Sequence, residues 1–222
     1  MFTGRGHARR CCMNADFSLL IKTLLTAPLQ TAPNQQIISD GLGLFTYRDF
    51  VCRLHRLAGA LSHEGVSQGD VVGVMDWDTH RYLECFFAVP MMGAVLHTIN
   101  IRLSPAQIAY TIDHAEDDVI LVHVDFLPLL EEAMAMVDRS VRLFVMRDAP
   151  TDQVEISKLD IEGIVSSMMA AAPPAFDFPD FDENLRATCF YTTGTTSDPK
   201  GVVYSHRQLV LHTMGILSTF GP

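Results

Sequence analysis

Short apolar runs typical of buried strands alternate with helical segments through the middle of the chain, and this alternation limits the possible folds more than any other feature. The runs occupy residues 71–75, 94–99, 118–124 and 141–146. They recur about every 25 residues with helical patterns between them, which is the spacing of strand-helix-strand units. Parallel strands joined in this way are covered by helices on both faces of their sheet. We therefore expect a layered α/β fold with a parallel sheet and flanking helices.

Capping signals mark where two of the helices begin. Thr46 with Asp49, and Ser104 with Gln107, have the spacing of an N-cap residue and its third helical residue, and a proline follows Ser104. The further elements expected are an amphipathic first helix at 17–27, a two-stranded hairpin at 35–47, a helix buried nearly all round at 79–92 and a helix at 127–137.

The pattern divides the chain into four stretches. We expect residues 1–16 to be a flexible N-terminal extension and residues 17–150 to form an α/β subdomain. Residues 151–186 combine a short helix at 160–172 with a linker whose prolines and acids suit exposure to solvent. Residues 187–222 then supply a strand, a loop, a second strand and a helix, which begin a second α/β part.

Composition excludes several classes of partner. The chain has 26 acidic against 16 basic residues and a formal charge of −10, so it offers no general attraction for nucleic acid or an anionic membrane. The longest apolar run, residues 85–96, is too short to span a bilayer. Five cysteines without C-x-x-C spacing indicate reduced thiols and a cytoplasmic location. A signal peptide is the alternative at the N-terminus, but Asp16 and Lys22 interrupt its apolar segment.

A loop rich in hydroxyl side chains follows the strand expected at residues 187–193. Gly194 can adopt backbone angles that turn successive N–H groups toward one point, and Lys200 adds a positive charge. The candidate phosphate-binding residues are Thr192, Thr193, Gly194, Thr195, Thr196, Ser197, Lys200 and Gly201. The alternative is a plain polar turn.

The residues after the loop distinguish it from a Walker A motif. In that motif a Gly-Lys-Ser/Thr sequence leads directly into a helix. Here Lys200 precedes Gly201, and the strand-like sequence VVYS follows. The helix begins only at Ser205, with Gln208 as its capping partner. The loop therefore joins two strands, and a P-loop kinase or ATPase is disfavoured.

The stretch YTTGTTSDPKGVV resembles the phosphate-binding signature of the adenylate-forming (AMP-binding) superfamily, Y-T-[ST]-G-T-T-G-x-P-K-G. It agrees from Tyr191 to Gly201 except at Ser197, where the family usually has glycine. Further stretches from about residue 40, including TYRDFVCRLHRLAGAL and GAVLHTINIRLSPAQIAY, are similar to acyl-CoA synthetases, in particular to medium- and long-chain fatty acid–CoA ligases.

The resemblance implies a reaction and its cofactors. In that family a carboxylate attacks the α-phosphate of ATP to give an acyl adenylate and pyrophosphate, and coenzyme A then forms the thioester. It implies that residues 192–197 wrap the β- and γ-phosphates, that Lys200 neutralises the triphosphate, and that Gly201 lets the second strand pass close. Thr192 becomes a candidate ligand of Mg²⁺. The implied substrate is a fatty acid.

The resemblance also implies that the chain is the N-terminal part of a ligase, because the family pattern continues well beyond the length seen here. We expect it to be incomplete for catalysis alone, with no catalytic residue of its own. The alternative is a non-catalytic nucleotide-binding or subunit-pairing module. An incomplete layered domain leaves apolar surface uncovered, so we expect a homo-oligomer or pairing with a missing C-terminal part.

Other side chains are interpreted as structural. The expected core histidines are His97, His123 and His212. His206 is expected in a capping turn, with a substrate-channel role as the alternative. The linker acids Asp177, Asp180, Asp182 and Glu183 are expected to solvate an exposed segment. The methionines expected to fill the core are Met134, Met136, Met168 and Met169.

Overall fold

The architecture is taken from a computed structural model, which describes residues 17–39, 43–149, 158–192 and 198–220. In chain order the elements are the 3₁₀ turn η1 (Ile21–Leu25), α1 (Thr26–Thr31), β1 (Gln36–Ser39), β2 (Gly43–Thr46), α2 (Tyr47–His63), β3 (Val71–Met75), α3 (His80–Met91), β4 (Val95–Thr98), α4 (Pro105–Ala115), β5 (Val119–His123), η2 (Val124–Phe126), α5 (Leu127–Met134), β6 (Arg142–Met146), β7 (Ile161–Ile164), α6 (Val165–Ala171), β8 (Arg186–Thr192), β9 (Lys200–Ser205) and α7 (His206–Phe220).

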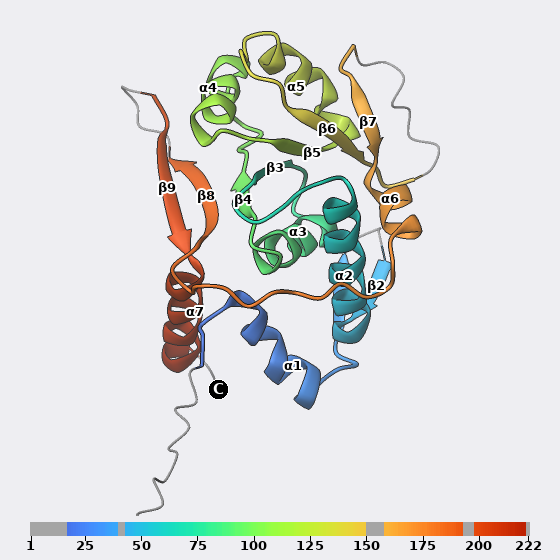
Figure 1. Cartoon of the computed structure of the whole chain (residues 1–222), viewed down its shortest axis with the longest axis vertical. Helices are drawn as coiled ribbons and strands as arrows, with labels where there is room; N and C mark the ends of the chain where they lie inside the picture. Colours follow the sequence, from blue (N-terminus) through green and yellow to red (C-terminus); the bar gives the residue numbers. More distant parts are fainter. Residues whose placement is uncertain (1–16, 40–42, 150–157, 193–197, 221–222) are drawn as a thin grey trace, which may run out of the picture.

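Seven strands form one sheet in the order β7-β6-β5-β3-β4-β8-β9. All neighbours are parallel except β8 and β9, which pair antiparallel at one edge. In Figure 1, α4 and α5 lie on one side of the sheet, and α2, α3 and α6 lie on the other. The layered α/β fold expected from the sequence is confirmed.

Strand alternation explains the two helix layers. Successive side chains of a strand point to opposite faces. In β5, Leu121 therefore belongs to the core shared with α2, α3 and α6, whereas Ile120 and Val122 belong to the core shared with α4 and α5. All five β5 residues are buried, which is why the strand reads as a continuous apolar run.

Both predicted capping pairs form. The Thr46 hydroxyl accepts a hydrogen bond from the Asp49 backbone N–H, and the Asp49 carboxylate accepts one from the Thr46 N–H. Ser104 and Gln107 make the same reciprocal pair at the start of α4. The hairpin is also confirmed, with β1 and β2 paired antiparallel.

The N-terminal helix differs from the expectation. Instead of one helix at 17–27, the chain forms the 3₁₀ turn η1 and then α1, which begins at Thr26. Pro28 explains the break, because a proline has no N–H to donate and is tolerated only in the first turn of an α-helix. The expected helix at 127–137 likewise ends earlier, at Met134.

The segment around residue 160 was also predicted wrongly. Ile161–Ile164 is not the start of a helix but strand β7, which adds to the sheet edge beside β6. The helix α6 follows it. Pairing with a distant strand overrides the local helical pattern here, and such pairing is not visible in a local window.

The linker after α6 is exposed at its prolines and at Asp177, Asp180 and Asp182, as predicted, but its phenylalanines pack on the core. Phe176 and Phe178 are half-buried and contact the core around α2. Lys22 Nζ donates to the carbonyls of Phe178 and Pro179, at 3.0 Å each.

The strands after the linker, β8 and β9, belong to the same sheet as β3 to β7. The boundaries at residues 150 and 186 remain a proposal.

The helix α3 is less enclosed than predicted. Leu83 and Phe86, one turn apart, are each 36% exposed. They line an open groove with Ile37 and Ile38 of β1. The inner side of α3 is buried, as expected for a helix between the sheet and α2.

Candidate functional site

The predicted phosphate-binding loop joins β8 to β9. Thr192 and Lys200 are the last cross-strand pair of this hairpin, and both residues are exposed. The structure thus agrees with a loop between two strands rather than between a strand and a helix. Gly201 is the next residue of β9. Residues 193–197, which are the predicted site residues Thr193, Gly194, Thr195, Thr196 and Ser197, lie outside the described residues.

The hairpin places Thr192 and Lys200 at the carboxyl edge of the sheet. Strand β8 runs parallel to β4, with Phe190 opposite Thr98, so Thr192 lies beyond the end of β4. In open α/β sheets, ligands bind outside the carboxyl ends of the strands. The carboxyl edge of the sheet is therefore a suitable place for a ligand bound by the β8–β9 loop.

Gly201 marks a close approach between the two strands. It pairs with Tyr191, and a Cβ atom at position 201 would lie 3.3 Å from the Tyr191 ring. Tyr191 is 8% exposed, and burial raises the pKa of its hydroxyl. Its hydroxyl lies 2.8 Å from Nδ1 of His114 on α4. Sequence analysis did not assign a role to Tyr191 or His114, because nothing in their sequence spacing shows that they meet.

A second polar cluster follows β3 at the same edge. The carboxylate of Asp76 accepts hydrogen bonds from the Trp77 N–H and the Thr79 hydroxyl, both at 2.8 Å, and pairs with Arg81. Burial, with the nearby arginines, lowers the pKa of His80 to about 4. These contacts fix the turn into α3. The sequence offered no signal for this cluster beyond isolated charged residues.

The predicted core histidines divide into two groups. His97 and His123 are buried and hydrogen-bonded, as expected. His212 is exposed on α7, so that prediction is wrong. His206 is fully buried, and its Nδ1 accepts from the Ile21 N–H at 3.3 Å. Burial lowers its pKa to about 4, which fits a structural role.

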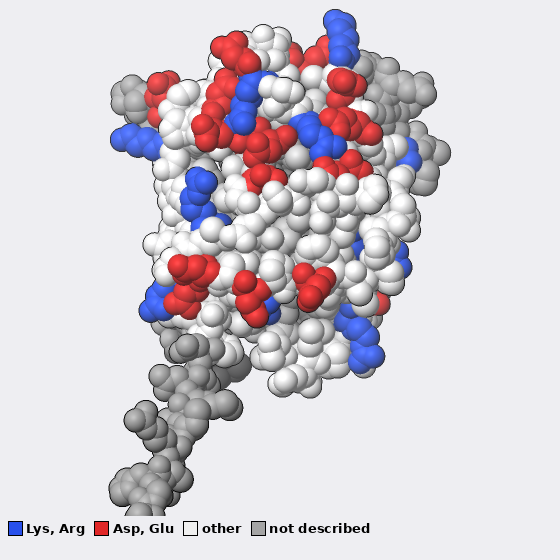
Figure 2. Space-filling model, in the orientation of Figure 1, with Lys and Arg blue, Asp and Glu red and all other residues white. Residues whose placement is uncertain are grey.

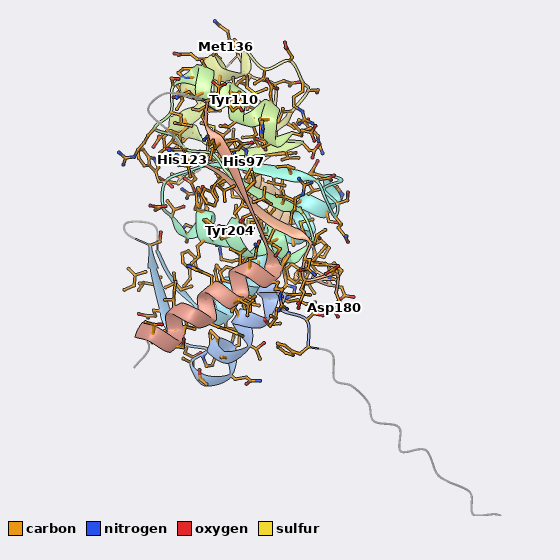
Figure 3. The ribbon with its side chains drawn as sticks, turned by 90° about the vertical axis from the view of Figure 1, so that its left-hand side faces the viewer. His97, Tyr110, His123, Met136, Asp180 and Tyr204 are labelled. Atoms are coloured by element: carbon orange, nitrogen blue, oxygen red, sulfur yellow. The ribbon has the colours of Figure 1, made fainter. Side chains whose placement is uncertain are left out.

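Two further expectations are corrected. Met136 is 47% exposed rather than part of the core, and Figure 3 places it at the far end of the molecule from α7. Glu183 does more than solvate a linker, since it accepts from the Leu19 N–H at 2.6 Å and pairs with Arg207. Those two partners lower the pKa of Glu183. Asp180 pairs with Lys22 at 2.8 Å.

On the side shown in Figure 2, acidic and basic side chains are interspersed, with an uncharged zone between an upper and a lower group. Within the described ranges there is no group of three or more metal-ligating His, Cys, Asp or Glu side chains. None of the helices in those ranges has both the length and the apolar character that a membrane-spanning segment needs.

Comparison with known proteins identifies the family. The profile of the family described as AMP-binding enzyme matches residues 26–220. The chain belongs to this AMP-binding enzyme family. The match spans the fold from α1 to the end of α7, so the resemblance found in the loop sequence extends over nearly the whole chain and is confirmed.

Among the relatives are CoA ligases. The chain is 43% identical over 169 residues to the long-chain-fatty-acid–CoA ligase of Thermus thermophilus, which covers 76% of this chain and 29% of that protein. It is 38% identical over 160 residues to the 3-methylmercaptopropionyl-CoA ligase of Ruegeria pomeroyi, covering 72% and 29% respectively. The chain thus spans less than a third of the length of these relatives.

Solved structures show the same fold. The crystal structure of the anthranilate CoA ligase AuaEII with anthranoyl-AMP matches with a TM-score of 0.76 and 22% identity, over 90% of this chain and 37% of that one. A Brucella canis acyl-CoA synthetase matches with a TM-score of 0.71 and 19% identity, over 84% and 33%.

Proposed function

We propose that this chain supplies the phosphate-binding part of an ATP-dependent, AMP-forming acid–CoA ligase. The reaction joins a carboxylate to ATP, giving an acyl adenylate and pyrophosphate, and then transfers the acyl group to coenzyme A. The observation that carries the proposal is the hairpin, which sets Thr192 opposite Lys200 at the carboxyl edge of the sheet. Pyrophosphate leaves readily only where donors and cations meet its developing charge.

Each hairpin residue has a role in this proposal. Residues 192–197 would hold the β- and γ-phosphates, and Lys200 would neutralise them. Gly201 allows β9 to lie against Tyr191. Ser197 stands where the family usually has glycine, and a left-handed backbone there would weaken the loop by about 1 kcal/mol.

Magnesium and coenzyme A complete the proposed reaction. When bound, Mg²⁺ would offset the charge of the triphosphate. It binds through phosphate oxygens with only one or two protein oxygens, so the Thr192 hydroxyl fits as a ligand. Coenzyme A is the third substrate, after the acid and ATP, and we place most of its site outside this chain.

The substrate class is a carboxylic acid, and we propose a fatty acid. The names of the relatives support this class, because they include long-chain and medium-chain fatty acid–CoA ligases. The Ruegeria pomeroyi relative is named for a different carboxylic acid, 3-methylmercaptopropionate. The proposal includes a cytoplasmic location, supported by the free thiols Cys52, Cys85 and Cys189 among the described residues.

A second candidate role is pairing with another polypeptide segment. Exposed apolar side chains gather on β9 and α7, at the sheet edge that faces the viewer in Figure 3. They are Val203, Tyr204, Leu211, Met214, Ile216 and Leu217. We propose that this face is covered by a second copy or by a further part of a longer ligase.

Acid-dependent ATP–pyrophosphate exchange tests the proposed chemistry. The 222-residue chain is assayed with straight-chain fatty acids of increasing length, beside its Lys200→Ala variant and the control Lys158→Ala, which removes a lysine that is 91% exposed and far from the hairpin in sequence. Exchange shown by the parent should persist in the control and be lost in Lys200→Ala. Exchange that survives Lys200→Ala would contradict the proposed role of the hairpin.

A further inference from the structure

Tyr191 connects the proposed phosphate site to the interior of the protein. It immediately precedes Thr192, the last residue of β8, and its ring is buried. The ring meets His97 edge-on at 5.2 Å between centroids and His114 at 5.6 Å. It therefore packs against β4 and the last turn of α4 at the same time.

The partner on β4 is held rigidly. His97 Nδ1 lies 2.9 Å from both carboxylate oxygens of Asp117, and neither side chain is exposed. Buried polar groups keep fixed positions when each is hydrogen-bonded, because breaking the pair would leave an unpaired group in the core. The ring of His97 is thus a fixed surface for Tyr191.

The partner on α4 holds the Tyr191 hydroxyl. With a neutral imidazole, the hydroxyl donates to Nδ1 of His114 at 2.8 Å. His114 itself is exposed, but it stands in the last turn of α4, which ends at Glu116 with a left-handed backbone. This bond ties the end of β8 to a helix on the face of the sheet.

The Tyr191 ring also sets the position of β9. A cavity beside the ring leaves the ring room to move. Gly201 faces the ring across the hairpin, at the distance where a Cβ would nearly touch it. A cavity of about 160 Å³ adjoins the ring and is lined by His114, Cys189, Tyr191, Gly201 and Val203 among others. The ring is buried but borders this cavity on one side, so the hydrogen bond selects its orientation together with packing.

We propose that Tyr191 is a positioning residue for the phosphate-binding hairpin, and that its hydrogen bond to His114 sets the ring orientation against which β9 lies. Through Gly201 and its neighbour Lys200, that orientation fixes where the lysine stands relative to Thr192. The inference rests on the proposed function, because it assigns the consequence to ATP binding.

Variants separate the hydrogen bond from helix stability. Asn at position 114 can place an amide oxygen near the position of Nδ1, whereas Leu cannot accept a hydrogen bond but is the better helix former. Tyr191→Phe removes only the hydroxyl. The matched control is Tyr110→Phe, which removes a hydroxyl from the ring beside His114 on the same helix.

The first measurement is the affinity for Mg·ATP by calorimetry. We expect Tyr191→Phe and His114→Leu to weaken binding about threefold or more, the size expected for one hydrogen bond, and the double variant to be no weaker than either. His114→Asn and Tyr110→Phe should stay within about twofold of the parent. If His114 acted only through the stability of α4, His114→Asn would weaken ATP binding more than His114→Leu, because Leu is the better helix former.

Hydrogen exchange of the β9 amides gives a second readout that needs no nucleotide. We expect faster exchange over Lys200–Ser205 in Tyr191→Phe and His114→Leu, but not in His114→Asn or Tyr110→Phe. If the parent does not bind ATP, or if Lys200→Ala binds it equally well, the proposed function fails. The hydrogen-exchange data would still test whether Tyr191 positions β9. Unchanged exchange in Tyr191→Phe, or equal effects of Leu and Asn at position 114, would overturn the inference.

Discussion

His206 begins α7 with its ring enclosed between Phe181 and the turn η1. The ring centroids of His206 and Phe181 are 4.9 Å apart, and the imidazole accepts a hydrogen bond from Ile21. Its Nε2 atom is buried without a partner among the described residues. Protonation would place a charge in this apolar site, which explains the lowered pKa.

That environment predicts a pH dependence of stability. The pKa of His206 is about 4 in the folded chain against its ordinary 6.5, so the unfolded chain binds more protons between these values. The free energy of unfolding should therefore fall as the pH drops from 6.5 to 4, by up to about 3 kcal/mol from this residue. His80, whose pKa is lowered similarly, contributes in the same direction.

Urea unfolding at pH 7 and pH 4.5 measures the effect. His206→Asn keeps an acceptor for Ile21, so its stability should depend on pH less steeply than that of the parent. His212→Asn, at an exposed position of the same helix, is the matched control. An unchanged pH dependence in His206→Asn would show that the buried imidazole is not responsible.

Sequence reasoning at the residue scale succeeded where a local rule applied. The order of Lys200 and Gly201 before a strand-like sequence predicted a loop between two strands, which the structure confirms, while their role in phosphate binding stays a prediction. Tyr191 and His114 were missed, since they are 77 residues apart and meet only through the sheet. His212 was misjudged because an apolar sequence neighbourhood does not say which face of a helix is covered.

The central strand β3 has no space for a side chain at Gly73. A Cβ atom at this position of β3 would lie 2.8 Å from Ile99 Cδ1 and 2.9 Å from Asp117 Oδ2. The glycine thus leaves space for the buried pair of Asp117 with His97. The Asp117 carboxyl has its pKa raised by burial, against the opposing effect of His97.

Alanine at two glycines should therefore have opposite effects. Gly73→Ala should lower the free energy of unfolding by about 1–3 kcal/mol through overpacking. Gly215→Ala, in α7 with nothing within 4 Å of the new Cβ, should raise it by up to about 1 kcal/mol. Urea unfolding of both variants measures this, and a shift of the same sign in both would refute the packing argument.

At the scale of elements, periodicity and capping residues predicted most helices and the parallel strands. These signals are local, as the hydrogen bonds of Thr46 and Ser104 show. Strand β7 was mispredicted and the packing of the linker phenylalanines was not foreseen, because both depend on contacts with distant segments. The pairing order of the sheet is also non-local and could not be read from the chain.

The molecule as a whole leaves one apolar face uncovered. Leu217 of α7 is 63% exposed, and Leu211 and Met214 are each 46% exposed. Strand β9 is an edge strand of the sheet, and its adjacent residues Val203 and Tyr204 are exposed on its two opposite faces. Contiguous exposed apolar side chains favour association.

We predict association of the chain that depends on concentration. Leu211→Gln with Leu217→Gln should shift the protein toward monomer, as followed by sedimentation velocity across a range of concentrations. The matched control replaces the exposed Ile38 and Leu44 of the β1–β2 hairpin with Gln. A single monomer species at all concentrations, or an equal shift in the control, would count against a role for the α7 face.

Binding of Mg·ATP to the chain, measured by calorimetry, tests whether the β8–β9 hairpin holds nucleotide phosphates. We predict that the parent binds, that Lys158→Ala binds within about twofold of the parent, and that Lys200→Ala binds about tenfold or more weakly, because it loses a charge-assisted contact. Equal affinities of the parent and Lys200→Ala, or no binding by the parent, would contradict the assignment of the β8–β9 hairpin as a nucleotide phosphate site.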